Sequence, residues 1–218
     1  MLSLENFWRM FNITQKINND KVLFMRVFIV FLVLIFSFQS WTKADDIREF
    51  EIEGMSIGDS ALDFFSESEI KKNSGDYYKK KTFTPFEVYK KPFFKVYEFV
   101  GGAFKTEDNN YIFHHIKGVI EYPNDIKSCY KKMDEISKEI SEIFKYEEDV
   151  KVRELRDEIF YGLEESNESI FSSDEYYFKS GDSIEVHCYD YSEKTPYKDA
   201  LQVGILTKEF GEFLIVAY

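Results

Sequence analysis

The stretch Asp125–Phe144, DIKSCYKKMDEISKEISEIF, predicts a long amphipathic helix that sets the fold. Asn124 or Asp125 can cap its first turn, because either side chain can accept a hydrogen bond from a backbone amide there. Lysine and glutamate fill the outer faces, while the apolar residues recur at steps of three and four. A helix with one apolar side must pack that side on another layer. The residues of this side are Ile126, Cys129, Met133, Ile136, Ile140 and Ile143.

Segments before and after this helix have the alternation and the β-branched and aromatic content of strands. Two of them precede the helix, at residues 93–100 and 111–122. Four follow it, and Ser180-Gly181-Asp182 and Glu209-Phe210-Gly211 are turn signals between neighbours. The expected strands after the helix span residues 176–179, 183–191, 201–208 and 212–218.

Two further helices are expected, at residues 60–72 and 150–165, where apolar residues again follow a helical spacing. Ser60 and Ser66 fit the pattern of serines that cap a helix start. Residues 79–91 are expected to be irregular. Strands grouped after helices predict an α+β fold. We expect an antiparallel sheet with helices packed on one face, in an order that also fits two helix-plus-strands halves.

The two cysteines of the chain, Cys129 and Cys188, are expected to form a disulfide. Cys129 lies on the apolar side of the long helix. In the strand 183–191, Cys188 points the same way as Ile184 and Val186, whereas Glu185, His187 and Tyr189 point the other way. Closing this loop would stabilise the fold by about 4 kcal/mol in the chain-entropy model. Two buried free thiols are the alternative.

The N-terminal part of the chain has the layout of a secretory signal. Met25-Arg26 precedes an apolar stretch at residues 27–36, which is shorter than a membrane-spanning helix requires. We therefore predict an upstream extension from a misplaced start at residues 1–24, a signal peptide at 25–44 and a single α+β domain at 45–218. The protein would then be periplasmic or secreted. An uncleaved N-terminal anchor is the alternative.

The charge of the chain limits its partners. The formal net charge is −12, and removal of residues 1–44 makes it more negative. A nucleic-acid-binding protein needs a basic surface, so nucleic acid is not an expected partner. Anionic lipid head groups are disfavoured for the same reason, and no stable membrane insertion is expected after signal cleavage.

The stretch Gly54-Met55-Ser56-Ile57-Gly58 fits the G-x-S-x-G pattern of a nucleophile elbow, and Gly58-Asp59-Ser60 fits a second hydrolase motif. A nucleophile elbow follows a buried parallel strand, but four of the six residues at 48–53 are charged. The chain's three histidines all lie within predicted strands rather than in a late loop. We therefore expect a helix entry here, and a small serine hydrolase that uses Ser56 or Ser60 is the alternative.

No metal site or cofactor is expected. His114 shares a face with apolar strand residues, which predicts a hydrogen-bonded core histidine, whereas His115 shares the opposite face with Lys117 and Glu121 and is expected to be solvated. Adjacent strand residues point in opposite directions, so this pair does not readily bind one metal ion.

The sequence Ile52-Glu53-Gly54-Met55-Ser56 at a helix entry, followed by strands and a second set of helix and strands, resembles the β-lactamase-inhibitor-protein-like architecture. That group includes the SmpA/OmlA outer-membrane assembly lipoproteins. Unlike those lipoproteins, this chain has no cysteine after the signal region. The stretches 180–193 and 207–210 also resemble uncharacterised exported proteins of AT-rich marine bacteria. Neither resemblance supplies a catalytic residue.

The function predicted from the sequence is a non-enzymatic interaction module of the cell envelope. The chain contains 23 Phe, 15 Tyr and 2 Trp, and aromatic residues are enriched in the cores of protein interfaces. We expect an envelope protein or another envelope component to bind an aromatic, acidic surface. The oligomeric state is left open.

Overall fold

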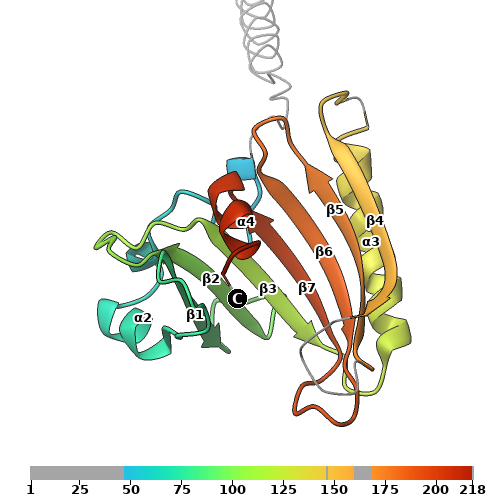
Figure 1. Cartoon of the computed structure of the whole chain (residues 1–218), viewed down its shortest axis with the longest axis horizontal. Coiled ribbons are helices and arrows are strands. Elements are labelled where there is room, and N and C mark those ends of the chain that lie inside the picture. Colours follow the sequence, from blue (N-terminus) through green and yellow to red (C-terminus); the bar gives the residue numbers. More distant parts are fainter. Residues whose placement is uncertain (1–46, 146, 160–167, 218) are drawn as a thin grey trace, which may run out of the picture. The chain divides into compact units, whose positions relative to one another are not determined.

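The computed structural model describes residues 47–145, 147–159 and 168–217 (Figure 1). Short 3₁₀ turns at Ile47–Glu49 and Ala61–Asp63 come first. The remaining described elements are α2 (Glu67–Asn73), β1 (Phe83–Tyr89), β2 (Phe99–Lys105), β3 (His115–Glu121), α3 (Ile126–Ile143), β4 (Lys151–Ile159), β5 (Ile170–Tyr177), β6 (Ser183–Asp190), β7 (Ala200–Leu206) and α4 (Lys208–Leu214).

The described strands form one antiparallel sheet in the order β1-β2-β3-β7-β6-β5-β4. Strands β1 to β3 and strands β4 to β7 are two meanders, and α3 connects them. The last strand, β7, pairs with β3 and so joins the two meanders in the middle of the sheet. The predicted α+β class with an antiparallel sheet is confirmed.

Helix α3 packs on β6 and β7 and confirms the long helix predicted from the sequence. Asp125 caps it, since its side chain accepts a hydrogen bond from the amide of Ser128 at 3.3 Å. A disulfide joins Cys129 of α3 to Cys188 of β6, with 6.0 Å between their α-carbons. Both cysteines are fully buried in the main hydrophobic core, which lies between α3 and the sheet.

On the opposite face of the sheet, the described helix α4 packs at one corner. Phe210 and Phe213 of this helix pack on Phe83 of β1, Ala103 of β2 and Leu206 of β7 in a second, smaller core. Thr207 caps α4 through the amide of Phe210. Packing of all helices on one face is therefore not confirmed, since α3 and α4 contact opposite faces.

The helix predicted at residues 150–165 was wrong over its described part, where β4 pairs with β5 as an edge strand. Val152, Leu155 and Ile159 follow a helical spacing, but Val152 and Ile159 are exposed and contribute little to the core. The pairing of β4 with β5 shifts register between Leu155 and Glu158, where Asp157 has a φ of 51°. This irregularity changes which residues of β4 share a face. Pairing with β5 therefore outweighs the helical preference of this charged segment.

Four other predictions also need correction. The strand expected at 93–100 starts at Phe99 and continues to Lys105 as β2. In the described part of the strand expected at 212–218, residues 212–214 belong to α4 and residues 215–217 form no strand, and α4 includes the Gly211 that was expected in a turn. Residues 79–91 contain β1, although they were expected to be irregular. The single helix expected at 60–72 is divided into a 3₁₀ turn and α2, and the predicted caps Ser60 and Ser66 start these two elements.

The predicted extension at 1–24 and signal peptide at 25–44 lie outside the described residues. None of the described helices is long and apolar enough to cross a membrane.

Candidate functional site

The face of the sheet opposite α3 carries polar and aromatic side chains. In β6, Cys188 points into the core, and its neighbours His187 and Tyr189 point to this second face, as the alternation predicted. Strand pairing places two adjacent rows of residues across this face. One row contains Tyr89, Phe99, Val119, Gln202, His187, Ser173 and Leu155, and the other contains Glu87, Gly101, Lys117, Gly204, Glu185, Glu175 and Arg153.

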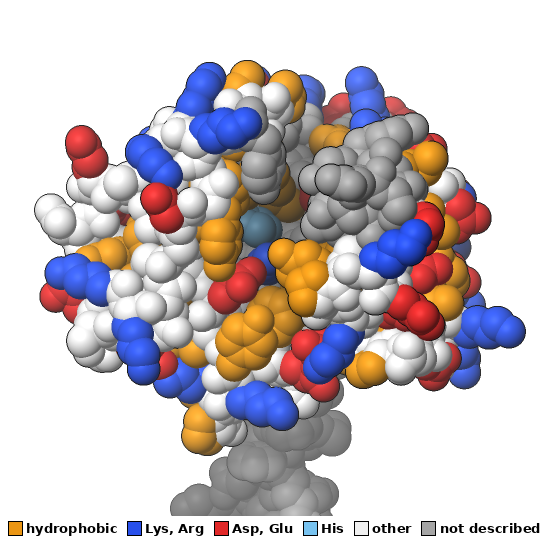
Figure 2. All heavy atoms as spheres, turned by 60° about the horizontal axis from the view of Figure 1, so that its bottom comes forward, with side chains coloured by type: hydrophobic (Ala, Val, Ile, Leu, Met, Phe, Trp, Pro, Cys, Tyr) orange, Lys and Arg blue, Asp and Glu red, His pale blue; other side chains and the backbone are white. Residues whose placement is uncertain are grey.

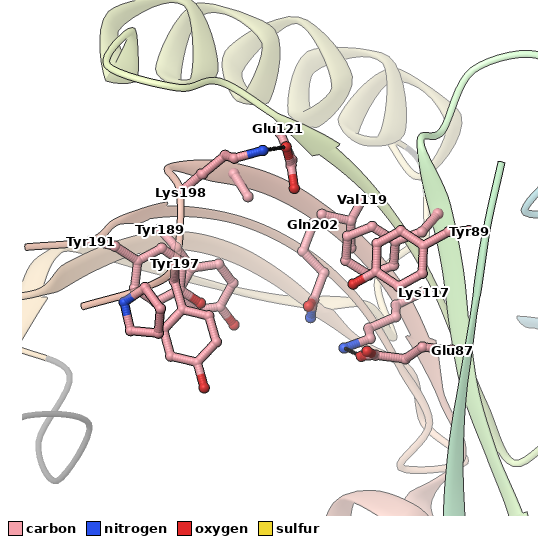
Figure 3. Close-up of a pocket in the computed structure, with 13 residues that line it drawn as sticks. Glu87, Tyr89, Lys117, Val119, Glu121, Tyr189, Tyr191, Tyr197, Lys198 and Gln202 are labelled. Carbon is pink, nitrogen blue, oxygen red and sulfur yellow. Dashed lines mark hydrogen bonds and ion pairs between the residues drawn. The ribbon is translucent and has the colours of Figure 1, made fainter. Parts of the chain in front are cut away.

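A cavity of about 330 Å³ lies on this face, between β1 to β3 on one side and the segment after β6 on the other. Figure 2 shows the surface hollowed, with hydrophobic side chains and charged side chains of both signs around a histidine. Figure 3 shows the strands arching over the side chains that line it. We call this cavity the tyrosine hollow, and its main lining residues are Tyr89, Phe99, Tyr189, Tyr191, Tyr197 and Gln202, together with two ion pairs described below.

Aromatic rings form two opposing walls of the tyrosine hollow. Tyr89 packs on Phe99 with 4.6 Å between ring centroids. On the other side, the rings of Tyr189 and Tyr191 are stacked at 5.6 Å, and Tyr197 lies 5.3 Å from Tyr191. Tyr89 is 60% exposed and Tyr197 57% exposed. Burial raises the pKa of Tyr191 to about 12, so its phenol is protonated at neutral pH and can donate a hydrogen bond.

Two ion pairs complete the lining. Lys117 Nζ lies 2.9 Å from Glu87 Oε1, and both side chains are mostly buried. Lys198 pairs with Glu121 near the other wall. Gly101 lies between Glu87 and Lys117 in their row, and a Cβ atom there would lie 2.6 Å from Lys117 Cε. The absence of a side chain at Gly101 lets this pair lie flat across β2.

A cluster of ionisable groups around the buried carboxylate of Glu175, which we call the acid cluster, continues the same face toward β4. Glu175 accepts a hydrogen bond from Arg153 Nε at 2.8 Å and another from the Tyr177 hydroxyl at 2.6 Å. Burial is the main cause that raises the pKa of Glu185 to about 7, and the negative charge of Glu175 is the second cause. Burial also lowers the pKa of His187 to about 4. The acid cluster consists of Arg153, Glu175, Tyr177, Glu185 and His187.

The acid cluster can exchange a proton near neutral pH, because one of its carboxyl groups titrates there. Two serine hydroxyls donate hydrogen bonds to its carboxyl groups. Ser173 donates to Glu175 at 3.1 Å, and Ser183 donates to Glu185 at 3.2 Å. His187 Nδ1 lies 2.8 Å from the Tyr189 hydroxyl. His187 thus links the acid cluster to the tyrosine hollow.

The motif serines form local structural contacts instead. The Ser56 hydroxyl donates to the carbonyl of Phe50 at 3.1 Å, and the Ser56 amide donates to Asp59 at 2.8 Å. The Ser60 hydroxyl donates to the carbonyl of Asn110 at 2.6 Å and accepts from the amide of Leu62. The hydrogen bonds of the described residues pair neither serine with a histidine. This is the helix-entry arrangement expected for the motif.

The two neighbouring histidines lie in different surroundings. His114 Nδ1 is 3.4 Å from the Thr207 hydroxyl. His115 was expected to be solvated, which was wrong, because α4 covers it and its ring stacks on Phe210 with a centroid distance of 4.8 Å. Burial lowers the pKa of His115 to about 3. Within the described part of the chain, no group of three or more His, Cys, Asp or Glu side chains is arranged to hold a metal ion.

Comparison of the chain with family models, with curated protein sequences and with solved structures finds no match. The candidate site therefore rests on its geometry. Sequence reasoning did not predict the tyrosine hollow, although the alternation in β6 indicated that Glu185, His187 and Tyr189 share a face away from the core.

Proposed function

We propose that this protein is an exported, non-enzymatic binding module that holds a component of the cell envelope in its tyrosine hollow. The observation that carries the proposal is the exposure of Tyr89 and Tyr197 on the walls of a polar cavity. Cavities with aromatic walls and a few convergent polar groups are the usual form of small-ligand sites. The core between α3 and the sheet stabilises the fold without using this face.

Export is supported by the disulfide between Cys129 and Cys188, because disulfides form and persist in oxidising compartments. A periplasmic or secreted location remains a prediction, as do the signal peptide and the resemblance to the β-lactamase-inhibitor-protein-like architecture.

A binding function is favoured over catalysis by the contacts of the candidate nucleophiles. The hydroxyls of Ser56 and Ser60, the serines of the two hydrolase motifs, donate to backbone carbonyls. A serine nucleophile needs a base within hydrogen-bonding reach of its hydroxyl proton. Among the described residues, neither motif serine has such a base as its hydrogen-bond partner.

The test is retention of the full chain on an extract of its own cell envelope. The double variant Tyr89→Ala, Tyr197→Ala removes one ring from each wall, and both rings are exposed enough for the fold to survive their loss. We expect this variant to lose retention. The control Tyr130→Ala, on α3 and on the opposite side of the sheet, should keep it. Equal retention of the wild type and the double variant, or no retention of either, would overturn the proposal.

A further inference from the structure

We infer that the tyrosine hollow binds a neutral sugar ring, as part of a free saccharide or of a longer glycan. This inference rests on the proposed binding function and adds the chemical class of the ligand. It follows from the charge balance of the hollow, from the arrangement of its rings, and from the donors and acceptors between them.

The charge balance favours a neutral ligand. Among the described residues that line the hollow, Glu87 and Glu121 are acidic, and Lys117 and Lys198 are basic. Each carboxylate is paired with one lysine, so the lining has no net charge although the whole chain carries −12. A cationic ligand would meet two ammonium groups and an anionic ligand two carboxylates. Neither would gain the net attraction that an uncompensated charge would provide.

The rings favour a flat or ring-shaped ligand. Figure 3 shows Tyr197 and Tyr89 on opposite sides of the hollow, with Gln202 between them on the sheet. The ring of Tyr89 contacts that of Phe99, and the ring of Tyr197 contacts that of Tyr191. A pyranose ring presents C–H groups on its faces, and these pack on the electron-rich faces of aromatic rings. The volume of about 330 Å³ is at the lower end of the range for small-molecule sites, so it suits one or two sugar rings better than a protein segment.

The polar groups favour a ligand with many hydroxyl groups. Gln202 offers both amide donors and a carbonyl acceptor, and each ion pair offers further ammonium donors and carboxylate acceptors. A sugar hydroxyl both donates and accepts, so neighbouring hydroxyls can use a donor and an acceptor side by side. A purely apolar ligand of the same shape would bury the Gln202 amide, and the donors and acceptors that the ion pairs do not use between themselves, without new partners, which costs about 1–3 kcal/mol for each group left unpaired.

The experiment is saturation-transfer difference NMR of the full chain with neutral disaccharides: maltose, lactose, cellobiose and N,N′-diacetylchitobiose. At least one of them should receive saturation on its ring C–H protons. Tyr197→Ala and Tyr89→Ala should each weaken this binding about tenfold or more, and Gln202→Ala about tenfold, as expected for the loss of one well-formed contact. Tyr130→Ala should leave the signal unchanged. Tyr197→Phe keeps the aromatic ring and should retain most of the binding. It tests the role of the ring in a folded protein if an alanine variant does not fold.

Three results would overturn the inference. The first is the absence of saturation transfer to all four neutral disaccharides. The second is binding that is unchanged in Tyr89→Ala and Tyr197→Ala. The third is tighter binding of glucosamine or glucuronic acid than of glucose, which would contradict the charge argument. If envelope retention still depends on Tyr89 and Tyr197 in any of these cases, the proposed binding function stands and only the ligand class is wrong.

Discussion

Cys129 and Cys188, 59 positions apart in the chain, are joined across the buried side of the sheet. The same strand that provides Cys188 turns His187 and Tyr189 to the opposite face, where the tyrosine hollow lies. The disulfide thus fixes β6 against α3 on one side and leaves the other side of β6 open.

The disulfide should make a large contribution to stability. Replacing both Cys129 and Cys188 by serine should lower the free energy of unfolding by about 4 kcal/mol, because the unfolded chain regains the freedom of the closed loop. Urea unfolding of the wild type with and without reductant measures this. The double serine variant is the control, since reductant should not change it. A wild type equally stable in both conditions would contradict the prediction.

Glu185 should make the protein less stable as the pH rises. Its pKa is raised from 4.5 to about 7 in the fold, mainly by burial, so the folded state holds a proton that the unfolded state releases between these values. The stability linked to this proton is fully present below pH 4.5 and is lost as the pH rises through about 7. Glu185→Gln mimics the protonated form, so its stability relative to the wild type should increase from pH 5 to pH 8.

The comparison of Glu185→Gln with the wild type is needed because other groups on this face also titrate. His187, whose pKa is lowered to about 4 by burial, contributes the opposite slope between pH 4 and 6.5. Glu175 and Arg153 face Glu185 from the neighbouring strands, and Ser183 donates to it. These groups are present in both proteins, so the difference curve isolates Glu185. A difference that does not vary with pH would contradict the assignment.

Glu53 should stabilise the turn that contains the G-x-S-x-G pattern. Its carboxylate accepts the backbone amides of Lys95, Val96 and Tyr97 at 2.7, 2.7 and 2.8 Å. Although burial opposes ionisation, these bonds lower the pKa of Glu53. Its contribution should be present above the ordinary carboxyl pKa and be lost as the pH falls through the lowered value.

Glu53→Gln should therefore lower the free energy of unfolding by about 1 kcal/mol at pH 7, since hydrogen bonds to a charged acceptor are replaced by bonds to a neutral one. The neighbouring exposed Glu51 supplies the control variant Glu51→Gln, which should have little effect. Thermal unfolding of the three proteins at pH 7 and pH 3 measures both effects. Equal losses in the two variants would show that the amide bonds of Glu53 are unimportant.

Gly101 should matter more for binding than for folding. In Gly101→Ala, the new methyl group would lie 2.6 Å from Lys117 Cε and 3.2 Å from Glu87 Cγ, so both side chains would have to shift. We expect a folded protein with weakened retention on envelope extract. Gly211→Ala is the matched control, because its added methyl group has no atom within 4 Å apart from its chain neighbours and the backbone of its own helix. It should keep retention and add about 0.5–1 kcal/mol of stability, since alanine is the better helix former. Unchanged retention of Gly101→Ala would count against the Lys117–Glu87 pair as part of the site.

The sequence predicted the parts of the fold whose periodicity is strong. The apolar spacing of residues 125–144 gave α3, and the alternation in 183–191 gave both the orientation of Cys188 and the opposite orientation of Glu185, His187 and Tyr189. The edge strand β4 was missed because its side chains are exposed on both faces, so burial imposes no alternation on them. Helix α4 was not predicted because Glu209-Phe210-Gly211 is typical of a turn.

The tyrosine hollow could not be predicted from local patterns, because its walls come from distant parts of the chain. Tyr89 lies in a segment that was expected to be irregular, and Tyr197 lies in the connection between β6 and β7. They meet on one face because β7 pairs with β3, which only the sheet order reveals. No pattern of spacing within either segment specifies that pairing.

The central claim, that the open face of the sheet is the binding face, is tested most directly by NMR. Backbone amide shifts of the ¹⁵N-labelled chain would be recorded before and after addition of soluble extract from its own cell envelope. We predict that the amides that shift or broaden lie in β1, β3, β7 and residues 191–199, around Tyr89, Gln202 and Tyr197. Changes confined to α3, or an unchanged spectrum, would contradict the claim.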